Sequence, residues 1–181
     1  METRAMSMLD RPIIEVRTGT PDDLDGMMAW AEAAAKDNAV VLPDRLKLLE
    51  LFWNALNCQS GIVGIVGEPD KPIEGAILLT VGALWYSQEP VLEEKVVFVL
   101  PEFRAAKGGR ARRLCEFSKQ ASRELNLPLM IGVLSNERTK GKMKLYERMF
   151  GAPAGVYFLY GGETGLDQSD IGKDDYLIGV E

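Results

Sequence analysis

The chain has 181 residues, 46% of them apolar and 27% charged, which is typical of one soluble globular domain with a continuous hydrophobic core. It contains no histidine, which excludes Ser-His and Cys-His nucleophiles, histidine-ligated metal sites and histidine as a general base. The formal charge of −6 argues against a general binder of nucleic acid or anionic membrane.

The remaining composition indicates a cytoplasmic protein. No apolar run approaches the roughly 18 residues that a membrane span needs, and the N-terminus lacks the apolar block of a secretory signal. Cys58 and Cys115 support neither a disulfide framework nor a metal cluster, and each is expected to be a small buried residue in a helix. We divide the chain into an N-terminal extension, residues 1–12, and a single domain, residues 13–181.

The N-terminal half predicts a strand, two helices and a β-meander. After a strand at residues 13–18, Thr20 provides a capping hydroxyl and Pro21 suits the first turn of a helix. Helically spaced apolar residues predict a second helix that begins at Pro43-Asp44 and ends near Leu56. Three strands separated by turn residues follow at 61–68, 73–86 and 91–100.

The C-terminal half alternates helices and strands. Pro101 ends the meander, and Gly108-Gly109 leads into a helix that ends near Leu125. The remaining elements are a strand at 129–134, a helix at 140–149 and strands at 156–160 and 176–180. A meander followed by a β-α-β crossover predicts an α/β fold: one mixed, mostly antiparallel central sheet with helices on both faces.

The segment 104–113, RAAKGGRARR, concentrates five cations on an otherwise acidic chain. It lies between a strand end and a helix start, where free N–H groups and the helix dipole favour phosphate. The glycines let the main chain approach a ligand closely, and Arg104, Lys107 and Arg110 add charge. A local anion site is therefore predicted, with a solvated basic helix start as the alternative.

This segment resembles the acetyl-CoA signature of the GNAT N-acetyltransferase superfamily, R/Q-x-x-G-x-G/A after a strand that ends V-x-V-x-P-E-Y/F-R. Residues 97–104 read VFVLPEFR. Arg104 and Gly109 occupy the first and last signature positions, and Lys107 stands at the family's first glycine. In general style the chain resembles phage and prophage members, and its element order agrees with the family from about residue 13 to 181.

The resemblance extends to the helix after the next strand, where the family has an asparagine followed by a tyrosine. Asn136 follows the strand and Tyr146 lies in the helix, ten positions later where the family has seven. Phe150-Gly151 replaces the family's Gly-Phe.

The resemblance implies a GNAT-like fold and an acetyl-CoA-dependent N-acetyltransferase without a metal, in which an amine of a small molecule or protein attacks the thioester directly. Tyr146 would protonate the leaving thiolate, and a backbone N–H of Phe98 or Val99 would stabilise the oxyanion. The residues implied to bind acetyl-CoA are Phe98, Val99, Arg104, Lys107, Gly108, Gly109, Arg110 and Asn136. Alternatively, Tyr146 is a tyrosine whose ring packs in the core, and the N–H of Phe98 or Val99 is an ordinary hydrogen-bond donor in the strand ladder.

Glu93 and Glu94 are the candidate bases, because two acids within an apolar strand are unusual. Strand neighbours face opposite sides, so only one of them can face the reaction centre. By alternation, Glu94 shares its face with Phe98, and Glu93 shares its face with Val97 and Val99. A solvated strand edge, or a water chain in place of a base, is the alternative.

Two further features concern the acceptor. Trp85 and Tyr86 either line its site or pack in the hairpin, and the acid-rich segment 162–175 suggests a cationic amine unless it is a solvated loop. The first rival function is a non-catalytic, acyl-CoA-binding GNAT-fold module that acts through protein–protein contact, for example a phage-encoded modulator of a host factor. An unrelated phosphate-binding α/β domain lacks the expected fingerprints. The sequence leaves a homodimer open.

Overall fold

The computed structural model describes residues 14–38, 41–104, 109–133 and 139–155. Their strands form one sheet in the order β1-β2-β3-β4-β5, with β1 to β4 antiparallel and β5 parallel to β4. The strands are β1 (Arg17–Thr18), β2 (Gly61–Val66), β3 (Gly75–Ala83), β4 (Pro90–Val99) and β5 (Leu129–Met130). This is the mixed, mostly antiparallel sheet that the sequence predicts.

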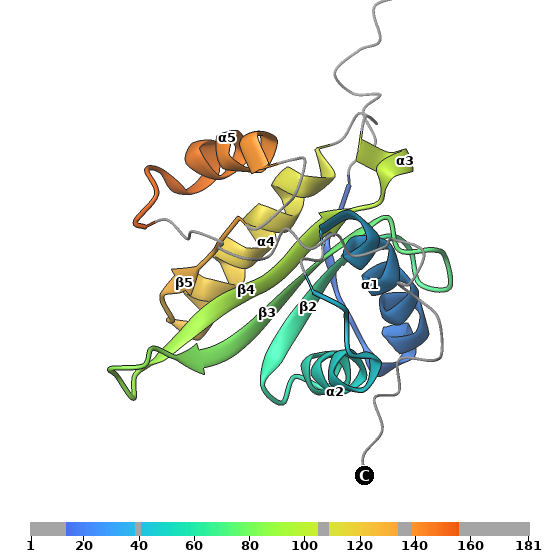
Figure 1. The fold of residues 1–181 in the computed structure, drawn as a ribbon, viewed down its shortest axis with the longest axis horizontal. Helices are drawn as coiled ribbons and strands as arrows, with labels where there is room; N and C mark the ends of the chain where they lie inside the picture. The colour runs from blue at the N-terminus through green and yellow to red at the C-terminus, as the bar shows by residue number, and fades with distance from the viewer. Residues whose placement is uncertain (1–13, 39–40, 105–108, 134–138, 156–181) are drawn as a thin grey trace, which may run out of the picture.

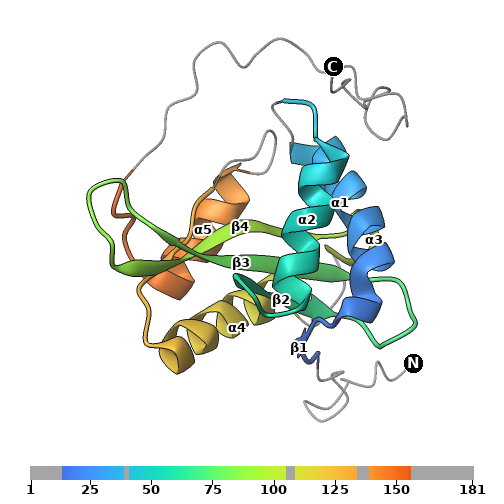
Figure 2. The ribbon, with the colours of Figure 1, turned by 90° about the horizontal axis from the view of Figure 1, so that it is seen from below.

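Helices cover both faces of the sheet (Figure 1), and the view turned by 90° shows α4 across the strands from α2 (Figure 2). On one face lie α1 (Leu24–Asn38) and α2 (Arg45–Leu56). On the other lie α4 (Arg110–Leu125) and α5 (Thr139–Phe150). Two short helices, η2 (Pro21–Asp23) and α3 (Pro101–Arg104), precede α1 and follow β4.

Each face of the sheet has its own hydrophobic core. Trp30 of α1 packs edge-to-face on Phe52 and Phe98, with ring centroids 6.4 and 5.9 Å apart. Across the sheet, Leu114 of α4 and Tyr146 of α5 are buried in the second cluster. The sheet is thus the middle layer, and α5 is held against the same face of β4 as α4.

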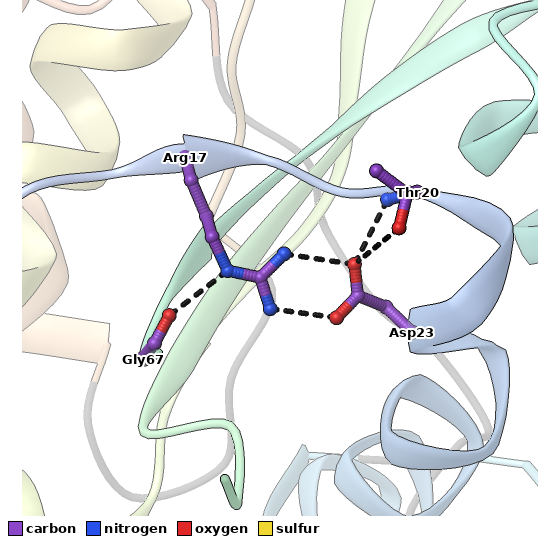
Figure 3. A network of polar contacts seen from close by, with 4 residues as sticks. All are labelled: Arg17, Thr20, Asp23 and Gly67. Atoms are coloured by element: carbon purple, nitrogen blue, oxygen red, sulfur yellow. Dashed lines mark hydrogen bonds and ion pairs between the residues drawn. The ribbon is translucent and has the colours of Figure 1, made fainter. Parts of the chain in front are cut away.

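An ion pair ties β1 to the helices that follow it (Figure 3). Arg17 donates from both Nη atoms to the Asp23 carboxylate at 2.8 and 2.6 Å, and from Nε to the Gly67 carbonyl at 2.9 Å. Asp23 also accepts from the Thr20 N–H at 2.8 Å, as in a capping box. The Arg17 guanidinium holds the pKa of Asp23 below its ordinary value. Side chains therefore anchor a strand that contributes only two residues to the sheet.

Element ends differ from the predictions where the chain loses a strand partner. β1 begins at Arg17 instead of Ile13, and β3 ends at Ala83 instead of Tyr86 because the hairpin turns there. β5 ends at Met130, four residues earlier than predicted, because the chain then leaves β4. The strands expected at 156–160 and 176–180 lie outside the described residues.

The two cysteines differ in their surroundings. Cys115 is buried in α4 as expected, whereas Cys58 is exposed in the turn after α2 with a φ of 54°. The prediction of a buried helical Cys58 is wrong because the helix ends two residues earlier, at Leu56. Within the part of the chain that the structure describes, no helix has the length and apolar character to cross a membrane.

β4 contains a bulge at Lys95. The consecutive β3 residues Leu78 and Leu79 pair with Val96 and Glu94, so Lys95 has no partner in the β3 register. An extra residue of this kind reverses the alternation of faces beyond it.

The bulge changes which glutamate shares a face with the end of β4. Glu94 contacts Tyr146, so it lies on the α4/α5 face together with Val97 and Val99. Phe98 lies on the opposite face, against Trp30. The prediction that Glu94 shares its face with Phe98 is therefore wrong.

Candidate active site

The candidate site lies where β5 diverges from β4. Parallel pairing joins only Leu92 to Leu129 and Glu93 to Met130, whereas β4 continues to Val99. Among the described residues, the edge of β4 that faces β5 has no ladder partner after Glu93. We call this stretch, residues 94–99, the open edge. Unpaired main-chain groups of this kind can bind an extended ligand.

Glu94 and Tyr146 meet beside the open edge. The Tyr146 hydroxyl donates to Glu94 Oε2 at 3.4 Å, and the Gly132 N–H donates to the same oxygen at 3.2 Å. Tyr146 is buried, and its ring packs edge-to-face with Phe150, with centroids 5.6 Å apart. A separation of 3.4 Å is long for an O–H···O bond, and catalytic contacts often tighten when ligands bind. The structure thus brings together a candidate acid and a candidate base.

Burial controls the electrostatics of this pair. It raises the pKa of Glu94, against the opposing effects of the Lys142 charge and the Gly132 N–H. Burial, and then the Glu94 charge, raises the pKa of the Tyr146 phenol, so this hydroxyl remains protonated at neutral pH. Lys142 has its pKa lowered by burial, against the attraction of Glu94.

Sequence reasoning missed Lys142. It precedes Tyr146 by four residues on α5, a spacing that places both side chains on one helix face. That spacing is the signal that could have identified it.

Glu93 does not join this cluster. Its carboxylate forms an ion pair with Lys95, and it lies over Gly82, at which an added Cβ would be 3.3 Å from the Glu93 carboxyl carbon. Because strand neighbours face opposite sides, Glu93 is directed away from Tyr146. Of the two glutamates, Glu94 is the one placed at the open edge.

The strand ladder distinguishes the two candidate oxyanion donors. The Leu100 N–H donates to the Glu74 carbonyl at 2.9 Å, toward β3. Alternation in an antiparallel ladder directs the Phe98 N–H toward β3 as well and the Val99 N–H toward the open edge. Phe98 therefore lacks the orientation that an oxyanion donor needs here, and Val99 has it.

Arg104, predicted to bind phosphate, is turned inward. Its Nε donates to the Val99 carbonyl at 2.7 Å, and its Nη2 pairs with Asp37 of α1. Its guanidinium also lies 4.7 Å from the centroid of the Phe98 ring. With 16% of the side chain exposed, Arg104 joins the end of β4 to α1. Its position in the sequence signature does not make its charge available at the surface.

The other described cations of this segment are also paired. Arg110 Nε contacts Glu74 Oε2 at 2.6 Å, and Arg112 and Arg113 both contact Glu116. Arg110 Nη1 is buried and has no hydrogen-bond partner in the described part of the chain. A buried guanidinium N–H without a partner suits an anion.

The N-terminus of α4 retains its main-chain donors. Gly109, the N-cap residue, has φ 66° and ψ 42°, a left-handed conformation that favours glycine. The first intrahelical acceptor is its own carbonyl, which binds the Arg113 N–H at 3.0 Å. The N–H groups of the first helical turn thus have no helical acceptor. Lys107, Gly108 and Asn136 lie outside the described residues.

Solved acetyltransferases share this fold. AAC(6')-Iy, in complex with the bisubstrate analogue CoA-S-monomethyl-acetylneamine, matches with a TM-score of 0.61 and 15% identity, covering 82% of this chain and 97% of that chain. The aminoglycoside acetyltransferase meta-AAC0020 from an uncultured soil metagenomic sample, in complex with sisomicin, matches with a TM-score of 0.59 and 17% identity. The match covers 82% of this chain and 95% of that chain. Ribosomal-protein-alanine N-acetyltransferase from Brucella melitensis biovar Abortus 2308 matches with a TM-score of 0.61 and 13% identity, and the match covers 82% of this chain and 99% of that chain.

No protein-family model and no curated protein matches the sequence. At these sequence identities the structural likeness establishes the fold alone. The chain has the mixed α/β fold of GNAT acetyltransferases, as the sequence predicts.

Proposed function

We propose that this chain is an acetyl-CoA-dependent N-acetyltransferase that transfers an acetyl group to a primary amine by direct attack. The observation that carries the proposal is the contact between Glu94 and Tyr146 beside the open edge. The structural relatives include acetyltransferases in complex with a CoA-containing bisubstrate analogue and with sisomicin. These complexes favour a small-molecule amine as the acceptor, and a protein amine is the other class to test.

The residues around α4 fit the pyrophosphate of acetyl-CoA. The free N–H groups of the first helical turn favour an anion, and the buried Arg110 Nη1 has no partner among the described residues. Apart from its chain neighbours, the nearest described atom to a Cβ placed on Gly109 is the Arg112 Cβ, at 3.8 Å. We assign anion binding to this main chain and to Arg110, and we assign Arg104 to the support of β4.

Glu94 and Tyr146 form a proton route in this proposal. Bound acetyl-CoA supplies an activated acetyl thioester. Glu94 takes a proton from the acceptor amine, and its raised pKa makes it a stronger base than a free carboxylate. Tyr146 has a raised pKa and is a weak acid alone, so it passes a proton to the leaving sulfur as it receives one from Glu94. The Val99 N–H stabilises the developing oxyanion.

The test begins with acetyl-CoA binding by calorimetry and continues with turnover on a panel of primary amines. Tyr146→Phe and Glu94→Gln should bind acetyl-CoA with little change and lose about 100-fold in turnover, the lower end of acid–base contributions. Glu93→Gln is the matched control, because it is adjacent on β4 but faces away from Tyr146. Equal turnover in all three variants contradicts the proton route. Absence of acetyl-CoA binding contradicts the proposed function itself.

One observation favours the alternative of a non-catalytic module that acts through protein–protein contact, such as a phage-encoded modulator of a host factor. Trp85 and Tyr86, in the hairpin between β3 and β4, are 95% and 69% exposed and pack edge-to-face with ring centroids 5.5 Å apart. Exposed aromatic side chains are typical of protein interfaces. Acetyl-CoA binding without turnover of any amine in the panel would favour this alternative.

A further inference from the structure

Lys119 of α4 contacts the last turn of α5 in two ways. Its Nζ donates to the Met149 carbonyl at 2.8 Å, and the same atom lies 5.7 Å from the centroid of the Phe150 ring. The last carbonyl groups of a helix have no donor within the helix, and the helix dipole favours a cation at this end. Lys119 therefore satisfies a free carbonyl of α5 and joins the end of this helix to α4.

The turn that Lys119 contacts also positions the Tyr146 ring. Phe150 follows Tyr146 by four residues, a spacing that places both side chains on one face of the helix. The two rings pack edge-to-face with centroids 5.6 Å apart, and the Tyr146 hydroxyl donates to Glu94 Oε2 at 3.4 Å. A continuous series of contacts thus runs from Lys119 through the two rings to Glu94.

α4 is the more firmly held of the two helices. Its residues Leu114 and Cys115 are fully buried in the core on that face of the sheet. On α5, by contrast, Tyr146 is the one buried side chain among residues 140–150. Two hydrogen bonds between described residues join α5 to other elements, one from Lys119 and one to Glu94. Because an element with few buried contacts has low local stability, loss of the Lys119 contacts should displace the turn next to Tyr146.

We propose that Lys119 is a positioning residue, which holds the last turn of α5 so that the Tyr146 hydroxyl stays at Glu94. This proposal rests on the proposed function, in which Tyr146 protonates the leaving sulfur. Lys119 exchanges no proton in this role and acts through the Met149 carbonyl and the Phe150 ring. A displacement of about 1 Å in a reacting group can cost about 100-fold in rate, so a contact between two helices can control turnover.

Lys119→Met tests this role, because it retains most of the apolar stem and removes the charge and the donor. Turnover should fall by about 10-fold, a part of the roughly 100-fold that a misplacement of about 1 Å can cost, and the affinity for acetyl-CoA should not change. Lys119→Arg keeps a donor for the Met149 carbonyl and should restore most of the turnover. Arg123→Met is the matched control, because Arg123 is exposed, one turn further along α4, and donates to the Lys119 carbonyl within the same helix at 3.1 Å.

A double-mutant cycle separates positioning from a general loss of stability. In a Tyr146→Phe background, Lys119→Met should lower turnover little further, because both changes act through one hydroxyl. If Lys119→Met causes the same fold loss in both backgrounds, Lys119 does not act through Tyr146 and the proposal is overturned. Unchanged turnover in Lys119→Met overturns it as well.

A second measurement does not depend on turnover. With 3-fluorotyrosine placed at position 146, the ¹⁹F resonance should move in Lys119→Met and stay near the wild-type position in Arg123→Met. A resonance that is the same in both variants contradicts the positioning role. Calorimetry separates the two proposals: acetyl-CoA binding and turnover without any effect of Lys119→Met overturn the positioning role alone. Absence of acetyl-CoA binding overturns the proposed function, and the role of Lys119 in the reaction with it.

Discussion

Replacing Arg104 by methionine should cost more stability than affinity for acetyl-CoA. The change retains most of the apolar stem but removes the Asp37 ion pair, the 2.7 Å bond to the Val99 carbonyl and the contact with the Phe98 ring at 4.7 Å. A hydrogen bond to a charged group contributes about 1.5–3 kcal/mol, and a cation–π contact contributes about 0.5–2 kcal/mol. Since Asp37 remains partly solvated and the terms are not additive, we expect a loss of about 2–4 kcal/mol in the free energy of unfolding.

Urea unfolding followed by tryptophan fluorescence measures this loss. Arg112→Met is the matched control, because its side chain is 68% exposed and, among the described residues, pairs with Glu116. An exposed pair of this kind contributes about 0–1 kcal/mol. A double-mutant cycle with Asp37→Asn should give a coupling energy between Asp37 and Arg104 of about 1 kcal/mol or more. If Arg104→Met is as stable as Arg112→Met but binds acetyl-CoA far more weakly, Arg104 contacts the ligand and the structural role assigned here is wrong.

Two other substitutions test the anchor of β1 and the turn before α4. The pKa of Asp23 is lowered in the fold, so its contribution to stability is present above the unfolded pKa of about 3.9 and is lost as pH falls through the folded value. Asp23→Asn should therefore be about 2 kcal/mol less stable at pH 7 by urea unfolding, and this difference should shrink as pH falls below the unfolded pKa of about 3.9; Glu68→Gln, at an exposed pair, should change little across the same range. Gly109→Ala places a side chain at φ 66°, which should cost about 1–2 kcal/mol and weaken acetyl-CoA binding in calorimetry. Gly141→Ala, inside α5, has no side chain or strand atom within 4 Å of an added Cβ among the residues that the structure describes, and it should be neutral or stabilising.

The fold could be predicted because its signals are local. Helical spacing of apolar residues after Pro43-Asp44 predicts α2, and in the structure Asp44 is the N-cap residue of this helix, with its carboxylate accepting from the Lys47 N–H at 3.0 Å. The meander follows from apolar runs separated by turn residues. Strand ends were less predictable, because they depend on where a partner strand stops. β5 shows this, since its pairing ends at Met130 although the apolar sequence continues.

The faces of β4 could not be predicted, because they depend on one inserted residue. Alternation assigns Glu94 and Phe98 to the same side, and no residue in LEEKVVFV marks the position of a bulge. The register with β3 shows the insertion at Lys95, and this register places Glu94 beside Tyr146. A sequence pattern can therefore nominate both glutamates, but only the strand pairing selects between them.

The charge that segment 104–113 offers to a ligand also could not be predicted from the sequence. Sequence clustering suggests an excess of positive charge at the start of α4, but every described cation of the segment contacts a carboxylate, from Asp37, Glu74 or Glu116. The paired carboxylates neutralise most of the positive charge that these side chains would offer to an anion. Binding of an anion there must therefore depend mainly on main-chain N–H groups and on Arg110 Nη1. Main-chain donors select by shape and are less sensitive to salt than exposed cations. The affinity for acetyl-CoA should therefore change little between low and moderate salt, and a steep loss with added salt would show that exposed cations dominate.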